Sequence, residues 1–317
     1  MRIDTHVHFR DGEQNYKETI AHGLAIAKEQ GGGYVFDMPN TSKPILRKGD
    51  VEKRLALVPE SEKGRYFLYV GATTNEDQLK EAISLVNEKK EVIGIKMFAG
   101  KSTGDLQILG EEEQKKVYQI LTDNNYAGVI SVHCEKESFM TNTFDSNNPI
   151  THAESRPKEA EIESVKDQIR FAKEVGFKGT LNICHVSCKE SVELVQDAKK
   201  EINVTCEVTP HHAMWDYSKL EEANGLLYKM NPPLRSKEDV LALQECIKDG
   251  KIDFIGTDHA PHTIGEKLHG PYPSGYPSLY LYKNFVEEFL PSIGVSEEQI
   301  SNMAFKNINK IFNLGLM

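Results

Sequence analysis

The first ten residues hold two histidines separated by a single residue, His6 and His8, and Arg10 follows at the same spacing. Side chains on a β-strand alternate between faces, so the two imidazoles should project to the same side, one above the other. Stacked imidazoles form a chelating pair suited to a transition metal. The alternative is that they are two polar residues closing an edge strand, and further ligands elsewhere in the chain must decide between the two.

Several apolar, strand-like segments contain or end in a polar residue that could face a shared site. These residues are Lys96, His133, His185 and Asp258. In a barrel of parallel strands, the C-terminal strand ends meet at one face, where active sites lie. Four histidines and an aspartate at such positions predict a metal centre.

The elements that would position these residues alternate along the whole chain. Period-2 or continuous apolar runs predict strands at residues 2–8, 34–38, 66–71, 92–98, 128–133, 180–185, 202–208 and 252–257. Helical periodicity predicts helices at residues 16–30, 50–59, 75–89, 111–124, 160–175, 190–199, 237–248 and 297–312. Strands alternating with helices are typical of an α/β fold, and eight such units predict a (β/α)8 TIM barrel. A single catalytic domain over residues 1–317 is expected.

Composition narrows the function classes. Hydrophobic content of 39% and charged content of 27% describe a globular protein, and the net charge of −10 argues against a general nucleic-acid surface. No apolar run reaches membrane-spanning length, so no membrane association and a cytoplasmic location are expected. The five cysteines are odd in number. Cys134 and Cys184 each adjoin a histidine, and strand alternation predicts that both face the helix layer as small apolar residues.

Lys96 differs chemically from the other candidates. A protonated lysine beside metal ions would be repelled and costly to desolvate. It suits the site if its amine has reacted with CO2, because the carbamate is an anion with two oxygens that could join two divalent ions. The alternative is a lysine whose amine extends outward to solvent.

Four segments together resemble the dihydroorotase family of the amidohydrolase superfamily: Asp4-Thr5-His6-Val7-His8-Phe9-Arg10, Met38-Pro39-Asn40-Thr41, Met230-Asn231-Pro232-Pro233-Leu234-Arg235 and Gly256-Thr257-Asp258-His259-Ala260-Pro261-His262. The segment Gly94-Ile95-Lys96-Met97-Phe98, continuing to Ser102-Thr103-Gly104, is similar to the carboxylated-lysine members. The motifs run from residue 4 to about residue 275, most of the chain.

The resemblance implies a binuclear metal centre. Histidine, carbamate and aspartate ligands suit zinc, cobalt and manganese alike, and zinc is the default because of its availability. One ion would be held by His6, His8, carboxylated Lys96 and Asp258. The second would be held by Lys96, His133 and His185, with a hydroxide bridging both ions. Asp258 would also be the catalytic residue that takes a proton from the hydroxide and passes it to the departing amide nitrogen.

The resemblance also implies a substrate and its contacts. The reaction would be the reversible interconversion of N-carbamoyl-L-aspartate and (S)-dihydroorotate in de novo pyrimidine biosynthesis. Arg10, Asn40 and His262 would hold the α-carboxylate, while Asn231 and the backbone near Gly275 would meet the ring amides. Ser102 and Thr103 would lie on a loop that closes over the substrate. Arg10 has a planar fork that matches a carboxylate, but an arginine is also commonly a surface ion-pair partner.

Two other functions stay open at this point. The first is a hydantoinase-like or allantoinase-like cyclic amidase with the same metals. The second is a catalytically silent homologue that serves as an assembly partner. Many superfamily members carry a β-sandwich built from segments flanking the barrel. Here only Met1 precedes the first strand, so the sandwich is expected to be absent and a homodimer interface is expected to cover the exposed surface.

Overall fold

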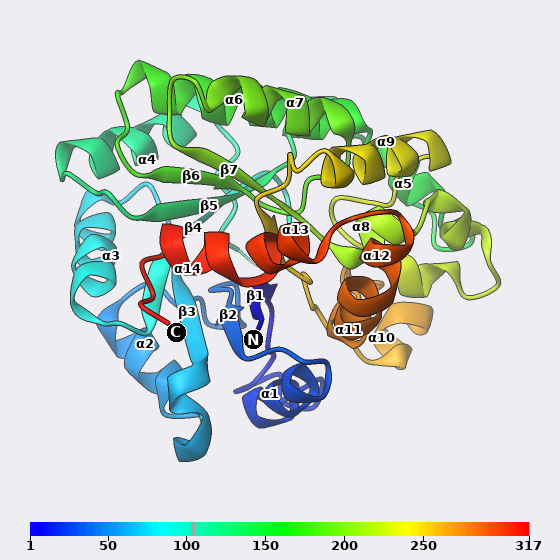
Figure 1. Cartoon of the computed structure of the whole chain (residues 1–317), viewed down its shortest axis with the longest axis horizontal. Helices are drawn as coiled ribbons and strands as arrows, with labels where there is room; N and C mark the ends of the chain where they lie inside the picture. Colours follow the sequence, from blue (N-terminus) through cyan, green and yellow to red (C-terminus); the bar gives the residue numbers. More distant parts are fainter. Residues whose placement is uncertain (103–104, 317) are drawn as a thin grey trace.

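Eight parallel strands form the centre of the molecule (Figure 1), as a computed structural model describes it for residues 1–102 and 105–316. They pair in chain order as β1 (Ile3–Val7), β2 (Tyr34–Asp37), β3 (Tyr66–Gly71), β4 (Val92–Ala99), β5 (Val129–Cys134), β6 (Thr180–Ile183), β7 (Val204–Val208) and β8 (Phe254–Ile255). The residues after β8 return to β1, since the His8 N–H donates to the His259 carbonyl at 2.7 Å and Val7 forms a parallel bridge with His259. The predicted (β/α)8 barrel is confirmed.

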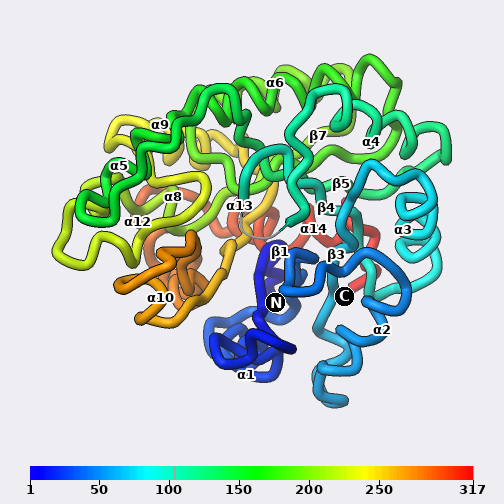
Figure 2. Tube along the Cα trace, turned by 180° about the vertical axis from the view of Figure 1, so that it is seen from behind, coloured from blue at the N-terminus to red at the C-terminus, as the bar shows by residue number. Residues whose placement is uncertain are grey.

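Helices surround this barrel (Figures 1 and 2). They are α1 (Ile20–Glu29), α2 (Lys48–Leu55), α3 (Glu76–Glu88), α4 (Glu111–Asp123), α5 (Thr151–Ser155), α6 (Lys158–Glu174), α7 (Lys189–Ala198), α8 (Pro210–Met214), α9 (Lys237–Lys248), α10 (Ile264–His269), α11 (Tyr282–Asn284), α12 (Leu290–Ser292), α13 (Glu297–Ser301) and α14 (Asn307–Ile311). Short 3₁₀ segments lie at Glu60–Arg65, Glu137–Phe139, Tyr217–Glu221, Gly225–Tyr228 and Ser278–Leu281. None of the helices in the described ranges is both long and apolar enough to cross a membrane.

The last helix differs from the prediction of one continuous helix over residues 297–312. It consists of α13 and α14 joined by a π-helical segment, Asn302–Lys306. Ser296 begins it with a capping box, in which the serine side chain accepts from the Gln299 N–H. Beyond α14, Phe312 packs edge-on against Phe36 of β2, with ring centroids 5.0 Å apart. This aromatic contact ties the end of the chain to the barrel strands.

Strands β6 and β8 each end two residues earlier than predicted, and both changes affect the site. β8 stops at Ile255 because the Thr257 N–H is taken by the Asp4 carboxylate at 2.8 Å instead of by a neighbouring strand. β6 stops at Ile183, and His185 adopts a positive φ of 38°. The chain therefore leaves the regular strand pattern just before two candidate site residues, His185 and Asp258.

Candidate metal centre and substrate pocket

One pocket collects most of the residues singled out in the sequence. Its lining includes His6, His8, Arg10, Asn40, Ser102, His133, His185, Asn231, Asp258 and Gly275. Lys96 lies beneath it, fully buried, and His262 contacts its wall through Arg10. Thr103 lies outside the described residues. The pocket is at the C-terminal ends of the strands, as active sites of this architecture are.

The two histidines of β1 meet Asp258 at the pocket floor. Asp258 Oδ1 lies 2.9 Å from His8 Nε2 and 3.4 Å from His6 Nε2. Ligand atoms of these three side chains lie within 4.8 Å of one another, close enough to surround one ion. Burial lowers the pKa of His8, and it lowers that of His6 further, so both rings are neutral at pH 7. A metal requires this form of imidazole.

Asp258 is the anionic member of this group. Burial alone would raise its pKa, but the adjacent His6 and the hydrogen bond with His8 lower the pKa well below its usual range. The carboxylate is therefore ionised over the whole physiological range. The Asp258 carboxylate therefore offers a negative charge and two oxygen atoms next to the His6 and His8 rings, as a metal ligand requires.

His133 and His185 form a second group beside the first. His133 Nδ1 lies 3.0 Å from His185 Nε2, and their ring centroids are 4.9 Å apart. His185 also neighbours His6, at 5.3 Å between centroids, so the four imidazoles form a continuous row. Within the described part of the chain, the buried Nδ1 of His185 has no hydrogen-bond partner. A buried nitrogen without a partner is costly, and an ion at this position would remove that cost.

Lys96 points into this row of histidines and away from solvent. Its amine donates to Cys184 Sγ at 2.9 Å and lies 5.1 Å from the centre of the Phe98 ring. The side chain is 0% exposed, which excludes the alternative of an outward-reaching lysine. The amine charge is close enough to contribute to the lowered pKa values of both His6 and His185. Lys96 is thus next to both groups of candidate ligands.

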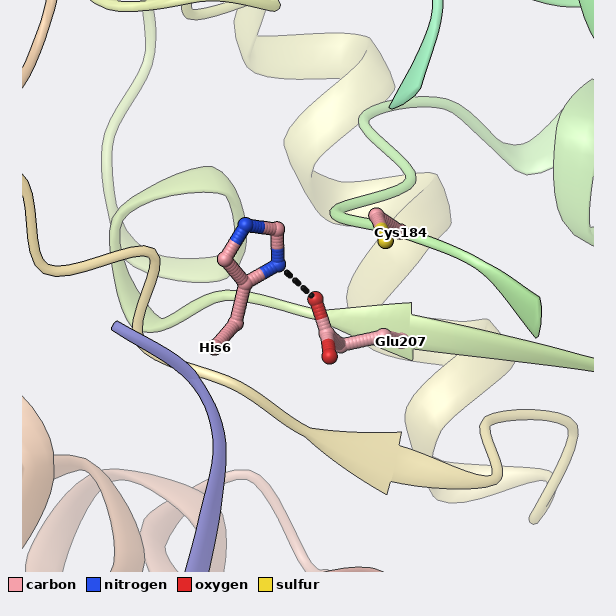
Figure 3. A group of neighbouring side chains, drawn as sticks. All are labelled: His6, Cys184 and Glu207. Carbon is pink, nitrogen blue, oxygen red and sulfur yellow. Dashed lines mark hydrogen bonds and ion pairs between the residues drawn. The ribbon is translucent and has the colours of Figure 1, made fainter. Parts of the chain in front are cut away.

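Glu207 of β7 was not predicted as a site residue, yet it is fully buried beside His6 (Figure 3). Glu207 Oε1 lies 2.7 Å from His6 Nδ1, and its other oxygen accepts from the Thr5 hydroxyl. Burial raises the pKa of Glu207 to about 7. A carboxylate that accepts one ring N–H fixes the tautomer and leaves the other nitrogen free to bind a metal. The available signal was one acidic residue in an otherwise uncharged strand, Val204–Val208.

The orientation predicted for Cys184 is wrong. Its sulfur lies with His6 and Glu207 in the barrel interior, not in the helix layer (Figure 3). The prediction assumed that Cys184 and His185 face opposite sides of a regular strand. The strand instead ends at Ile183, and the positive φ of His185 lets the side chains of both Cys184 and His185 face the site. Burial raises the pKa of the Cys184 thiol to about 12, so it is a protonated thiol and a poor ligand. Cys134, by contrast, packs in the outer core as predicted.

Arg10 and Asn40 line the pocket, and His262 contacts Arg10. Arg10 is only 4% exposed, with Nη2 3.4 Å from His262 Nε2 and its Nε–H donating to the Pro261 carbonyl. This burial excludes the alternative of an exposed surface ion pair. Burial and the Arg10 charge lower the pKa of His262 to about 2, so this imidazole is neutral. Asn40 Oδ1 lies 2.7 Å from His8 Nδ1, an arrangement that leaves His8 Nε2 facing Asp258.

Asn231 and Gly275 lie at the same pocket. Among the described residues, the buried Oδ1 of Asn231 has no hydrogen-bond partner. Gly275 has φ 143°, and a Cβ there would lie 2.5 Å from the Ala260 carbonyl and 3.0 Å from His262 Cδ2. Only glycine fits this backbone, which brings peptide groups close to the pocket.

Curated relatives resemble the chain over most of its length. A protein named dihydroorotase from Fusobacterium nucleatum is 33% identical over 328 residues, covering 98% of this chain and 72% of the relative. A dihydroorotase from Methanosphaera stadtmanae is 29% identical, covering 98% of this chain and 70% of the relative. A dihydroorotase from Brevibacillus brevis is 36% identical, covering 84% of this chain and 62% of the relative. No protein-family model matches the chain.

Solved structures share the architecture at lower identity. The dihydropyrimidinase from Brevibacillus agri superposes with a TM-score of 0.83 at 22% identity, covering 99% of this chain and 71% of that one. The dihydroorotase from Campylobacter jejuni superposes with a TM-score of 0.73 at 21% identity, covering 100% of this chain and 84% of that one. At these identities the likeness establishes the shared barrel fold and does not distinguish between substrates.

Proposed function

The chain belongs to the dihydroorotase family, and from this membership we propose that it is a metal-dependent cyclic amidohydrolase that interconverts N-carbamoyl-L-aspartate and (S)-dihydroorotate in de novo pyrimidine biosynthesis. The resemblance stated from the sequence motifs is confirmed by relatives of that name. The small-molecule substrate, the residue roles and the metals are parts of the proposal. Residues 1–317 are proposed to act as one catalytic domain, and a homodimer is the expected assembly.

The donor set suits two divalent ions, with zinc as the default. His6, His8 and Asp258 would hold one ion, His133 and His185 the other, and carboxylated Lys96 would contribute an oxygen to each. The neutral imidazoles, the ionised Asp258 and the unpartnered His185 Nδ1 support this assignment. When bound, such a pair of ions polarises a carbonyl and lowers the pKa of water between them.

Lys96 is proposed to be N6-carboxylysine. An unmodified, protonated Lys96 would be costly to desolvate at this buried position, and its positive charge would be repelled by the two metal ions proposed to bind there. Conversion to a carbamate replaces that positive charge with a negative one and supplies two oxygen ligands. The full burial of Lys96 and the contribution of its amine charge to the lowered pKa values of His6 and His185 support this proposal, because they indicate that the side chain lies near both histidine groups.

The chain's own residues would bind and orient the substrate. Arg10 would pair its guanidinium fork with the exocyclic carboxylate, and the neutral His262 and Asn40 would complete that site. Asn231 and the Gly275 backbone would meet the ring amides. Asp258 would accept a proton on its carboxylate and deliver it to the amide nitrogen as the ring opens. Ser102 lines the pocket and is proposed to cover the bound ring, with Thr103 next to it in the sequence.

The single observation that supports a carboxylate substrate is the buried Arg10 at the pocket wall, 3.4 Å from His262. Hydantoin and allantoin rings have no carboxylate equivalent to that of dihydroorotate. With those substrates, the buried Arg10 guanidinium would have no carboxylate to pair with. Assaying dihydroorotate, hydantoin and allantoin side by side tests this. Preferred turnover of dihydroorotate is expected, and equal or better turnover of an uncharged ring would contradict the assignment.

A further inference from the structure

A second lysine, Lys267 of α10, is buried behind the substrate pocket. In both views α10 lies on the same side of the barrel as α5 and α8 (Figures 1 and 2). Lys267 is 4% exposed, and its amine donates to three backbone carbonyls, those of Lys229 at 2.8 Å, Gly275 at 2.8 Å and Pro273 at 3.2 Å. An ammonium group has three N–H donors, so each has an acceptor.

The three carbonyls belong to two segments that are distant in the sequence but adjacent at the pocket. One is residues 229–231, which ends in Asn231, and the other is residues 273–275. The Gly275 N–H donates to the Lys229 carbonyl at 2.9 Å, and the Lys229 amine donates to Ser274 Oγ at 2.9 Å. Asn231, Ser274 and Gly275 all line the pocket. Lys267 therefore joins the two segments through its hydrogen bonds to their carbonyls.

Burying this cation is costly. Lys267 has no carboxylate within ion-pair distance in residues 1–102 and 105–316, and burial together with the nearby Lys229 lowers its pKa to about 7. A methionine could fill a similar volume without a desolvation cost. A methionine could not donate hydrogen bonds to the three carbonyls. These hydrogen bonds therefore explain why a lysine occupies this position.

We propose that Lys267 is a positioning residue that fixes the distance between Asn231 and Gly275, and through it the placement of the substrate ring. The Ser274 carbonyl also lies 3.2 Å from His262 Nε2, so the same loop connects the ring contacts to the carboxylate contacts. This inference rests on the proposed function, because it assigns Asn231 and Gly275 to the ring amides. Lys267 itself does not touch the substrate.

The test compares Lys267→Met with Lys248→Met, a control in which the lost amine pairs with Glu245 on the outer helix α9. In Lys267→Met, KM for dihydroorotate should rise about tenfold or more, with a smaller change in kcat, because the ring contacts lose their spacing. Metal content should equal that of the wild type. Amide hydrogen exchange in residues 271–276 should be about tenfold faster, since opening of this segment becomes easier. The control should change neither quantity.

The proposal is overturned if KM stays within about twofold of wild type or if exchange of the 271–276 segment is unchanged. If Lys267→Met does not accumulate in a folded form, Lys267→Gln, which keeps two N–H donors, should show the same two changes at smaller size. Wild-type protein that fails to turn over dihydroorotate would refute the proposed function instead. The exchange measurement would then still decide whether Lys267 fixes the two segments.

Discussion

Glu207 Oε1 lies 2.7 Å from His6 Nδ1, and this contact turns the opposite nitrogen of the ring toward Asp258. The carboxylate is itself held by the Thr5 hydroxyl and by the backbone N–H of His185, so one buried side chain contacts residues of both histidine groups. We infer that Glu207 orients the side chains proposed to bind metal, His6 above all.

Replacing Glu207 by glutamine should weaken metal binding. The amide is similar in size but loses the negative charge that fixes the His6 tautomer, so metal affinity should fall by about 10- to 100-fold. Titration with a competing chelator measures this directly. Glu201→Gln, at an exposed residue paired with Lys173, is the matched control and should bind metal as the wild type does. Unchanged affinity in Glu207→Gln would refute the orienting role.

Lys96→Ala should abolish activity and prevent the binding of two ions per chain, because both groups would lose the oxygen ligand proposed for carboxylated Lys96. Small carboxylates such as acetate should restore part of the activity by occupying the vacated space. Carbon-13 NMR of protein equilibrated with labelled bicarbonate gives a readout independent of activity. A carbamate signal is expected in the wild type and not in Lys96→Ala. A fully active Lys96→Ala, or a wild type without that signal, would contradict carboxylation.

Arg10→Met should leave metal content intact and selectively damage the use of a carboxylate substrate. The loss of a charge-assisted pair at a buried site corresponds to about 2–3 kcal/mol, so kcat/KM for dihydroorotate should fall by roughly 100-fold. Any turnover of hydantoin should change little. Arg47→Met is the control, since Arg47 forms an exposed pair with Glu81. Wild-type kcat/KM in Arg10→Met would show that Arg10 does not bind the carboxylate.

His152 should make the protein sensitive to acid. Its Nε2 lies 2.8 Å from the Met230 carbonyl, and burial together with nearby cations lowers its pKa to about 3, against an ordinary value of 6.5. Between those two pH values the unfolded chain binds the extra proton, so the free energy of unfolding falls as the pH falls from 6.5 toward 3. For one proton the slope is at most about 1.4 kcal/mol per pH unit.

Denaturant unfolding at several pH values measures this slope. His152→Gln should flatten it relative to the wild type, whereas His22→Gln, at an exposed residue, should not. An equally steep slope in His152→Gln would mean that other groups account for the acid sensitivity.

The positions of the strands and of the main ligand candidates could be predicted because they depend on local patterns. His6 and His8 follow from strand alternation, and β3 (Tyr66–Gly71) and α9 (Lys237–Lys248) begin and end where predicted. Cys184 could not be placed correctly because alternation fails where a strand ends, and the end of β6 depends on the positive φ of His185.

Glu207 and Lys267 were missed for a different reason. Their partners are distant in sequence, His6 for the first and Lys229 for the second. A charged residue in an apolar strand or on a short helix does not reveal which neighbours it will meet. Such pairings depend on the closed barrel and become visible only when all eight strands are in place.

The most direct test is the reversible dihydroorotate assay with metal quantification on the same purified sample. Turnover in both directions, with about two divalent ions per chain, is the expected result. Because ring closure consumes one proton, the ratio of ring to open form should also rise about tenfold per unit decrease in pH. Absence of turnover in a folded sample that holds two ions per chain, or less than about one ion per chain after gentle purification, would contradict the account.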